Sequence, residues 1–311
     1  MPLDSSLKTL LDALQSQPTP PMWQMDPAMA RIAFGALMQA VGPRDEPIGS
    51  TKDVAISNGR VRLRVYTPLK APRGDLPALL FFHGGGYVIG DLETHDGLCR
   101  ILANEAGACV IAVDYRLAPE HKFPAAVDDG LAALRYVQDH AADLGIDPDR
   151  LAVGGDSAGG GLAAVLAQAA AQQGWRLQMQ MLLFPVTQIG QDTPSLTAFA
   201  EGYFLEREGL RWFYAHYLPD NVDRDDPRIS PLKAKDVRGL APAFVMLAGF
   251  DPLHDEGLHY ADRLRQAGVP VTLRDYPDMV HDFIYMVSAL PAARTALSDA
   301  AAALKTALSR E

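Results

Sequence analysis

Two short stretches decide the fold of this chain: Phe81-Phe-His-Gly-Gly-Gly86 and Gly155-Asp-Ser-Ala-Gly159. Each follows an apolar run that is typical of a buried strand, at residues 78–82 and 151–155. The second stretch also leads into a run of small residues that favours a helix beginning at Ala158. The sequence therefore predicts a strand, a tight turn carrying Ser157 and a helix, with a glycine-rich loop after a second strand.

These two turns predict the two halves of one acyl-transfer site. A Gly-x-Ser-x-Gly turn holds its serine at a strained bend, where only small neighbours fit. That pattern alone arises by chance in roughly one chain in ten of this length. The tetrapeptide His-Gly-Gly-Gly is expected by chance only about 0.004 times per chain of the same length. Glycine backbone N–H groups stabilise the negative charge that nucleophilic attack places on a carbonyl oxygen. The alternative for Gly84, Gly85 and Gly86 is a plain flexible turn.

The rest of the chain predicts an α/β fold. From residue 78 onward, apolar strand patterns alternate with helical patterns, which indicates a mostly parallel central sheet with helices on both faces. An alternating segment at 61–66, preceded by Asn58-Gly59, indicates an edge or antiparallel strand after a turn. Ligands of such sheets bind beyond the carboxyl ends of the strands. The expected buried strands are 78–82, 109–113, 151–155, 180–184, 244–247 and 271–273.

Two segments do not follow the alternation and predict a helical cap. The N-terminal segment contains two helical patterns, the second beginning at Asp26-Pro27, a capping residue before a proline suited to a first helical position. The second segment, between Pro185 and Pro242, carries an apolar helical stripe. We expect residues 46–185 and 236–311 to form the catalytic domain, and 1–45 and 186–235 to form the cap over the site. The alternative is that the N-terminal helices dock elsewhere on the sheet.

A serine nucleophile needs a base and a residue that orients that base. The chain order of a nucleophile-elbow fold is serine, acid, histidine. His281 follows the last expected strand and is therefore the expected base. Asp251 follows the preceding strand and is the expected acid, whereas Asp255 is better read as a first-turn residue of the next helix.

Composition excludes several other classes of protein. The 311 residues carry a net charge of −10, which disfavours nucleic acid and anionic membrane as partners. The N-terminus resembles no signal peptide and no stretch is long enough to span a membrane, so a cytoplasmic protein is expected. Cys99 and Cys109 are expected to be reduced core residues. No metal-binding spacing is present, and the acidic segment 223–226 is interpreted as a solvated loop.

With these residues in place, the chain resembles the bacterial hormone-sensitive-lipase-like carboxylesterases of the α/β-hydrolase superfamily. The resemblance implies an α/β-hydrolase fold, a small-molecule ester of short to medium acyl chain as substrate, and no cofactor. It also implies that the backbone N–H groups of Gly85, Gly86 and Ala158 form the oxyanion hole. The segments that carry it are His83-Gly-Gly-Gly86, Asp114-Tyr-Arg-Leu-Ala-Pro-Glu120, Gly155-Asp-Ser-Ala-Gly159, Glu201-Gly-Tyr203 and Asp251-Pro-Leu253.

One departure from the family pattern concerns the base. The family usually has glycine after the catalytic histidine, but here Asp282 follows His281. A second carboxylate is expected to favour protonated His281 and raise the pH at which it can act as a base. The charged residues of segment 114–120 are expected to brace the glycine-rich loop through paired hydrogen bonds, and the alternative is that they form a solvated face. Four residues are expected to contribute to the cap core more than to the pocket wall: Phe34, Leu205, Phe213 and Tyr214.

Three readings of function remain at this stage. The leading one is a serine carboxylesterase that forms an acyl-enzyme on Ser157. A peptidase or amide hydrolase with the same triad is the second, because the chemistry is shared. The third is a non-catalytic small-ligand binding protein on the same fold, against which His281 argues.

Overall fold

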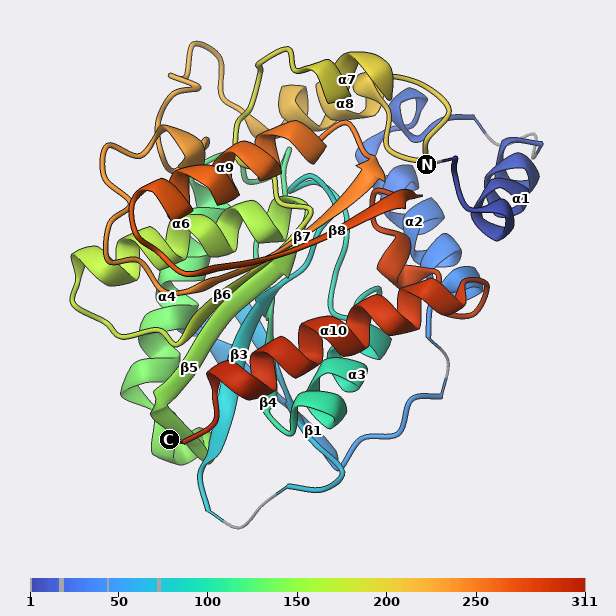
Figure 1. The fold of residues 1–311 in the computed structure, drawn as a ribbon. Helices are drawn as coiled ribbons and strands as arrows, with labels where there is room; N and C mark the ends of the chain where they lie inside the picture. The colour runs from blue at the N-terminus through green and yellow to red at the C-terminus, as the bar shows by residue number, and fades with distance from the viewer. Residues whose placement is uncertain (1, 17–19, 44, 72–73, 311) are drawn as a thin grey trace.

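The computed structural model describes residues 2–16, 20–43, 45–71 and 74–310, which fold around one eight-stranded sheet (Figure 1). The strand order is β1-β2-β4-β3-β5-β6-β7-β8. β1 and β2 pair antiparallel, as do β2 and β4, and all later pairs are parallel. The strands are β1 Ser50–Ile56, β2 Val61–Thr67, β3 Leu76–Phe82, β4 Cys109–Asp114, β5 Ile146–Asp156, β6 Met179–Leu183, β7 Ala243–Phe250 and β8 Val271–Val280. The prediction of a mostly parallel sheet is confirmed.

Helices cover both faces of this sheet, as predicted. α3 and α10 lie side by side on one face, and α4 packs against α6 on the other (Figure 1). β3 and β6 are buried along their whole length, because they are covered on both sides. The helices are α1 Ser5–Gln15, α2 Pro27–Val41, α3 Asp96–Ala106, α4 Ala125–Asp139, α5 Ala141–Leu144, α6 Ala158–Gln172, α7 Pro194–Ala198, α8 Arg207–Tyr217, α9 His254–Gln266 and α10 Pro291–Ala307, with short 3-10 turns η1 Met22–Gln24, η2 Ser57–Gly59, η3 Pro231–Lys233 and η4 Phe283–Tyr285.

The strands differ from the expectation at the sheet's two edges. The segment expected at 61–66 as an edge or antiparallel strand is β2, which is antiparallel to both its neighbours but is not an edge strand, since β1 covers it. β1 escaped prediction because it is largely exposed and lacks an apolar alternation. The expected turn is present, with Asn58 at φ 57° and Gly59 at φ 82°. β8 continues to Val280, well past the apolar residues that predicted it.

The N-terminal segment and the insertion lie together at the carboxyl end of the sheet (Figure 1). α8, from the insertion, packs against η1, from the N-terminal segment. α2 begins as predicted, with the Asp26 carboxylate accepting the N–H groups of Ala28 and Met29. α1 also contacts the catalytic sheet, since the Asp4 N–H donates to the Asp278 carbonyl of β8 at 3.0 Å.

Two further expectations concern the whole molecule. Cys99 and Cys109 are both buried free thiols, as predicted. Within the described ranges, none of the helices combines the length and the apolarity needed to cross a bilayer.

Candidate active site

Ser157 lies at the sharp turn between β5 and α6, with φ 53° and ψ −119°. Its neighbours must be small. A Cβ on Gly159 would collide with the backbone carbonyl of Phe82, and one on Gly155 would collide with the same carbonyl and with Gly159. The backbone of Ser157 is fixed to β6 by a 2.8 Å hydrogen bond from its N–H to the Leu183 carbonyl. The predicted strand, turn and helix are therefore confirmed.

The structure brings Ser157, His281 and Asp251 together. His281 Nε2 lies 2.9 Å from Ser157 Oγ, and His281 Nδ1 lies 2.7 Å from Asp251 Oδ2. The three residues are 7%, 2% and 0% exposed. With the proton on Nδ1 donated to Asp251, the lone pair of Nε2 accepts the serine hydroxyl proton.

Strand ends place the histidine and the acid as the sequence predicted. His281 follows β8 directly, and Asp251 follows β7. Asp251 Oδ1 accepts the N–H of Leu253 at 2.8 Å, which holds the carboxylate toward His281. Asp255 lies in the first turn of α9, as expected.

Two of the three predicted oxyanion donors, Gly85 and Gly86, line the same cavity as Ser157, and the third, Ala158, is the next residue in the chain. Gly85 and Gly86 have φ of 103° and 60°, values that favour glycine. Ala158 is the first residue of α6, where a backbone N–H has no partner within the helix. Among the described residues, no backbone or side-chain acceptor takes the N–H of Gly85, Gly86 or Ala158. These groups are thus available to an oxygen atom.

The glycine-rich loop is braced differently from our expectation, which was wrong about the charged side chains. Arg116 pairs with Asp129 of α4 at 2.7 Å, and Asp114 and Glu120 pair with arginines outside the loop. Instead, the Tyr115 hydroxyl donates to the His83 carbonyl at 2.7 Å, and the Tyr115 ring stacks on His83 at 4.2 Å. Tyr115, and not the charged side chains of segment 114–120, therefore braces this loop.

An apolar cavity of about 120 Å³ opens over Ser157 and His281. The four residues expected to be cap core more than pocket wall serve both roles: Phe34 and Phe213 are buried in the hydrophobic core, Leu205 and Tyr214 pack against it, and all four also line this cavity. The Phe213 ring also lies where a Cβ of Gly86 would be, so α8 packs directly on the loop. The lining residues from the N-terminal segment and the insertion include Met22, Trp23, Phe34, Leu37, Phe204, Leu205, Glu206, Leu210, Phe213 and Tyr214.

Asp282 brings a carboxylate into this apolar wall. Its Oδ2 lies 3.6 Å from His281 Nε2, and its Oδ1 is buried without a hydrogen-bond partner among the described residues. Burial raises the pKa of Asp282 to about 6, although the positive charge of His281 lowers it. Burial alone would lower the pKa of His281, but the charges of Asp251 and Asp282 raise it to about 9. The base is therefore strong, and its protonated form is favoured at neutral pH.

Sequence reasoning missed two buried groups beside the site. The carboxylate of Glu256, in α9, accepts the N–H groups of Thr187 and Gln188, and burial raises its pKa to about 8. The ring of His95 accepts the N–H of Gly84. Neither role could be found from the spacing of residues in the sequence, because each contact joins segments that only the folded chain brings together.

In the described parts of the chain, no group of histidine, cysteine and acidic residues is arranged to hold a metal ion.

Comparison with known proteins agrees with this architecture. The family model for the α/β hydrolase fold matches residues 79–285, and the chain belongs to this family. The resemblance to hormone-sensitive-lipase-like carboxylesterases is thereby confirmed. Among curated relatives, carboxylic ester hydrolase LipN of Mycobacterium tuberculosis is 44% identical over 81% of this chain and 68% of its own length. Ethyl acetate hydrolase of Pseudomonas putida is 44% identical over 86% of each chain.

Solved structures give the same result. An ester hydrolase from the metagenome of Lake Arreo, solved with a derivative of bipyridine phosphonate, superposes with a TM-score of 0.94 at 42% identity over 98% of both chains. A thermostable esterase from Pseudomonas putida ECU1011 superposes with a TM-score of 0.95 at 38% identity, covering 100% of this chain and 99% of its own. The predicted α/β-hydrolase fold is confirmed.

Proposed function

We propose that this protein is a serine carboxylesterase that hydrolyses short- to medium-chain acyl esters through an acyl-enzyme. The observation that carries the proposal is the hydrogen-bonded chain from Ser157 through His281 to Asp251, which lies at the same cavity as Gly85 and Gly86. The names of the relatives support the class, since several are ester hydrolases or esterases. At the level of carboxylic ester hydrolase, the prediction is confirmed.

The proposed mechanism follows from the geometry. Ser157 Oγ forms a bond to the ester carbonyl carbon as its proton passes to His281 Nε2. The carbonyl oxygen becomes an oxyanion that accepts the N–H groups of Gly85, Gly86 and Ala158. The C–O bond to the alcohol then breaks, and the alcohol leaves with the proton from His281. Asp251 stabilises the imidazolium and does not take the proton.

In the second half of the reaction, hydrolysis of the acyl-enzyme, water replaces serine as the nucleophile and His281 again transfers the proton. A water molecule attacks the acyl carbon and gives its proton to His281 Nε2. The bond to Ser157 Oγ then breaks, and the serine recovers that proton as the carboxylic acid leaves. The apolar cavity, which both the N-terminal segment and the insertion line, supports a small uncharged ester as substrate.

We further propose the division into a catalytic domain, 46–185 and 236–311, and a helical cap, 1–45 and 186–235. Contact between α8 and η1 and their shared cavity wall support it. A cytoplasmic location also remains a proposal.

The test is Ser157→Ala, with Ser309→Ala at the exposed C-terminus as the matched control. Loss of turnover on p-nitrophenyl esters should be on the order of 10⁶-fold for Ser157→Ala and absent for the control. An acyl-chain series on the parent protein then measures the substrate range. Retention of most activity by Ser157→Ala would refute the mechanism.

Matched ester and amide substrates separate the esterase from an amide hydrolase with the same triad. We expect a higher kcat/KM on the ester than on the matched anilide, and the reverse order would favour the amide hydrolase. Failure of a phosphonate to label Ser157 would favour a non-catalytic binding protein.

A further inference from the structure

We propose that His95 is a positioning residue for the oxyanion hole, acting through the backbone of Gly84. The inference rests on the proposed esterase function and adds a residue outside the predicted triad and its three donors. His95 Nε2 accepts the Gly84 N–H at 3.2 Å. Gly84 directly precedes Gly85 and Gly86, so this bond fixes the start of the loop from which both donors project.

The hydrogen bonds around the His95 ring fit one of its two tautomers. Thr94 Oγ1 donates to the Asp91 carbonyl at 2.9 Å and lies 2.8 Å from His95 Nδ1. With the hydroxyl proton donated to Asp91, Thr94 Oγ1 is an acceptor for the His95 Nδ1–H. The lone pair of Nε2 is then free to accept the Gly84 N–H. Only the neutral ring with its proton on Nδ1 makes both bonds.

The ring cannot turn away from Gly84 without disturbing the core. His95 is 1% exposed, and its ring lies 5.3 Å from that of His83 and 4.9 Å from that of Tyr285. The Asp156 carboxylate, one residue before the nucleophile, lies 3.5 Å from His95 Nε2. A Cβ on Gly84 would collide with this carboxylate, so the loop passes closely between Asp156 and His95.

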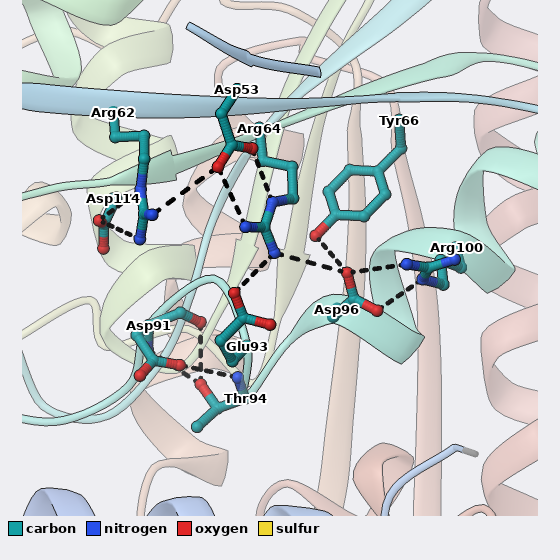
Figure 2. Close-up of polar contacts among 10 residues, drawn as sticks. All are labelled: Asp53, Arg62, Arg64, Tyr66, Asp91, Glu93, Thr94, Asp96, Arg100 and Asp114. Carbon is teal, nitrogen blue, oxygen red and sulfur yellow. Dashed lines mark hydrogen bonds and ion pairs between the residues drawn. The ribbon is translucent and has the colours of Figure 1, made fainter. Parts of the chain in front are cut away.

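The segment that carries His95 is tied to the antiparallel edge of the sheet, as Figure 2 shows. Arg64 of β2 forms an ion pair with Glu93 at 2.8 Å and lies 3.8 Å from Asp96. The same guanidinium also forms an ion pair with Asp53 of β1 at 2.8 Å. Asp96 also accepts the Tyr66 hydroxyl at 3.0 Å.

A second tie closes the segment on itself. The Asp91 carboxylate accepts the Thr94 N–H at 2.8 Å, and the Asp91 N–H donates to Thr94 Oγ1 at 2.9 Å (Figure 2). Residues 91–96 are therefore anchored on both sides of His95. This gives the imidazole a fixed position from which to hold Gly84.

The experiment compares three substitutions at this position. His95→Gln places an amide oxygen where Nε2 lies and keeps an acceptor for Gly84. His95→Phe keeps the ring volume without an acceptor, and His95→Asn carries an amide too short to reach Gly84. Each is measured for kcat and KM on a neutral p-nitrophenyl ester and for inhibition by a trifluoromethyl ketone, whose hemiketal oxyanion occupies the hole.

We expect His95→Phe and His95→Asn to lose about 10- to 100-fold in kcat and a similar factor in ketone affinity, with KM nearly unchanged. His95→Gln should stay within a few-fold of the parent. The inference would be overturned by a parental kcat in His95→Phe or by a change confined to KM. It would also be overturned if His95→Gln lost as much activity as His95→Phe.

Two controls keep the outcome decisive. If the three variants do not fold, Thr94→Val removes the acceptor of the Nδ1–H instead, and a parental kcat and ketone affinity in that variant would overturn the inference. Ser157→Ala is measured in parallel. An active Ser157→Ala refutes the proposed function, whereas an inactive Ser157→Ala beside fully active His95 variants refutes only the role of His95.

Discussion

Asp282→Asn should change the pH dependence of ester hydrolysis in two opposite ways. Asp282 Oδ2 lies 3.6 Å from His281 Nε2. At that distance, an effective dielectric constant between about 20 and 80 gives an attraction of roughly 1 to 5 kcal/mol, or about 1 to 3 pKa units. Removing the negative charge therefore lowers the pKa of His281 from its value of about 9. Asparagine also tolerates the φ of 56° at this position.

The sign of the effect depends on pH. Below the pKa of His281, most of the parent holds a protonated histidine, so the variant has more neutral base and a higher kcat/KM. Above that pKa, the base is neutral in both proteins, and the parent gains because Asp282 stabilises the imidazolium formed in the transition state. If about half of the charge has developed in the transition state, a shift of about 2 pKa units raises the acid limb about 10-fold and lowers the alkaline plateau about 10-fold.

The assay is kcat/KM on a neutral p-nitrophenyl ester, measured from about pH 5 to about pH 10 and corrected for spontaneous hydrolysis. The two profiles should cross at a pH between the two values of the His281 pKa. They should converge again below about pH 6, where the raised pKa of Asp282 makes the parent's carboxyl neutral too. Glu206→Gln is the control, since it neutralises another acid of the same cavity wall. Parent and Asp282→Asn profiles that overlay would refute the reasoning.

Three further predictions concern other parts of the site. Burial raises the pKa of Glu256 to about 8 from 4.5, so the free energy of unfolding should fall more steeply between about pH 5 and about pH 8.5 in the parent than in Glu256→Gln. Urea unfolding at about pH 5 and about pH 8.5 checks this, and equal pH dependence in both proteins would contradict it. Gly85→Ala should lose about 100-fold or more in kcat, because its Cβ would collide with the Ile89 carbonyl. The control Gly107→Ala, also at a positive φ but in open space, should keep parental kinetics. Parental kcat in Gly85→Ala would count against the loop geometry. Tyr214 lines both the catalytic cavity and a second cavity of about 440 Å³, so truncation to alanine should join the two. Tyr214→Ala should therefore move the preferred p-nitrophenyl ester to longer acyl chains. An unchanged chain-length profile, matching that of Tyr203→Ala, would show that Tyr214 does not limit the cavity.

The residues that could be predicted are those whose positions follow from local rules. Ser157 sits in a pentapeptide whose small residues have a steric cause within a few positions of sequence. His281 and Asp251 follow from chain order, because each comes directly after a parallel strand. Asp282 could be predicted to matter from its place directly after His281, because two adjacent residues bring a carboxylate near the imidazole.

The residues that could not be predicted depend on register and on long-range packing. Arg62 and Asp114 are direct cross-strand partners in the β2 and β4 pair, which is why Asp114 does not reach the glycine-rich loop. Glu120 pairs with Arg31 of α2, a helix whose position on the sheet is not encoded in its own sequence. A charged side chain near a motif in sequence therefore says little about its partner.

Two neighbouring carboxylates determine how strong a base His281 is. His281 is buried beside an apolar cavity, yet Asp251 and Asp282 both act on its ring, and Asp156 adds a weaker attraction. Such an arrangement strengthens the base and stabilises the imidazolium, at the cost of a protonated resting state at neutral pH. Faster turnover under mildly alkaline conditions follows from this. Because an uncharged residue cannot supply the second charge, we predict that Asp282 raises the pH at which this triad works.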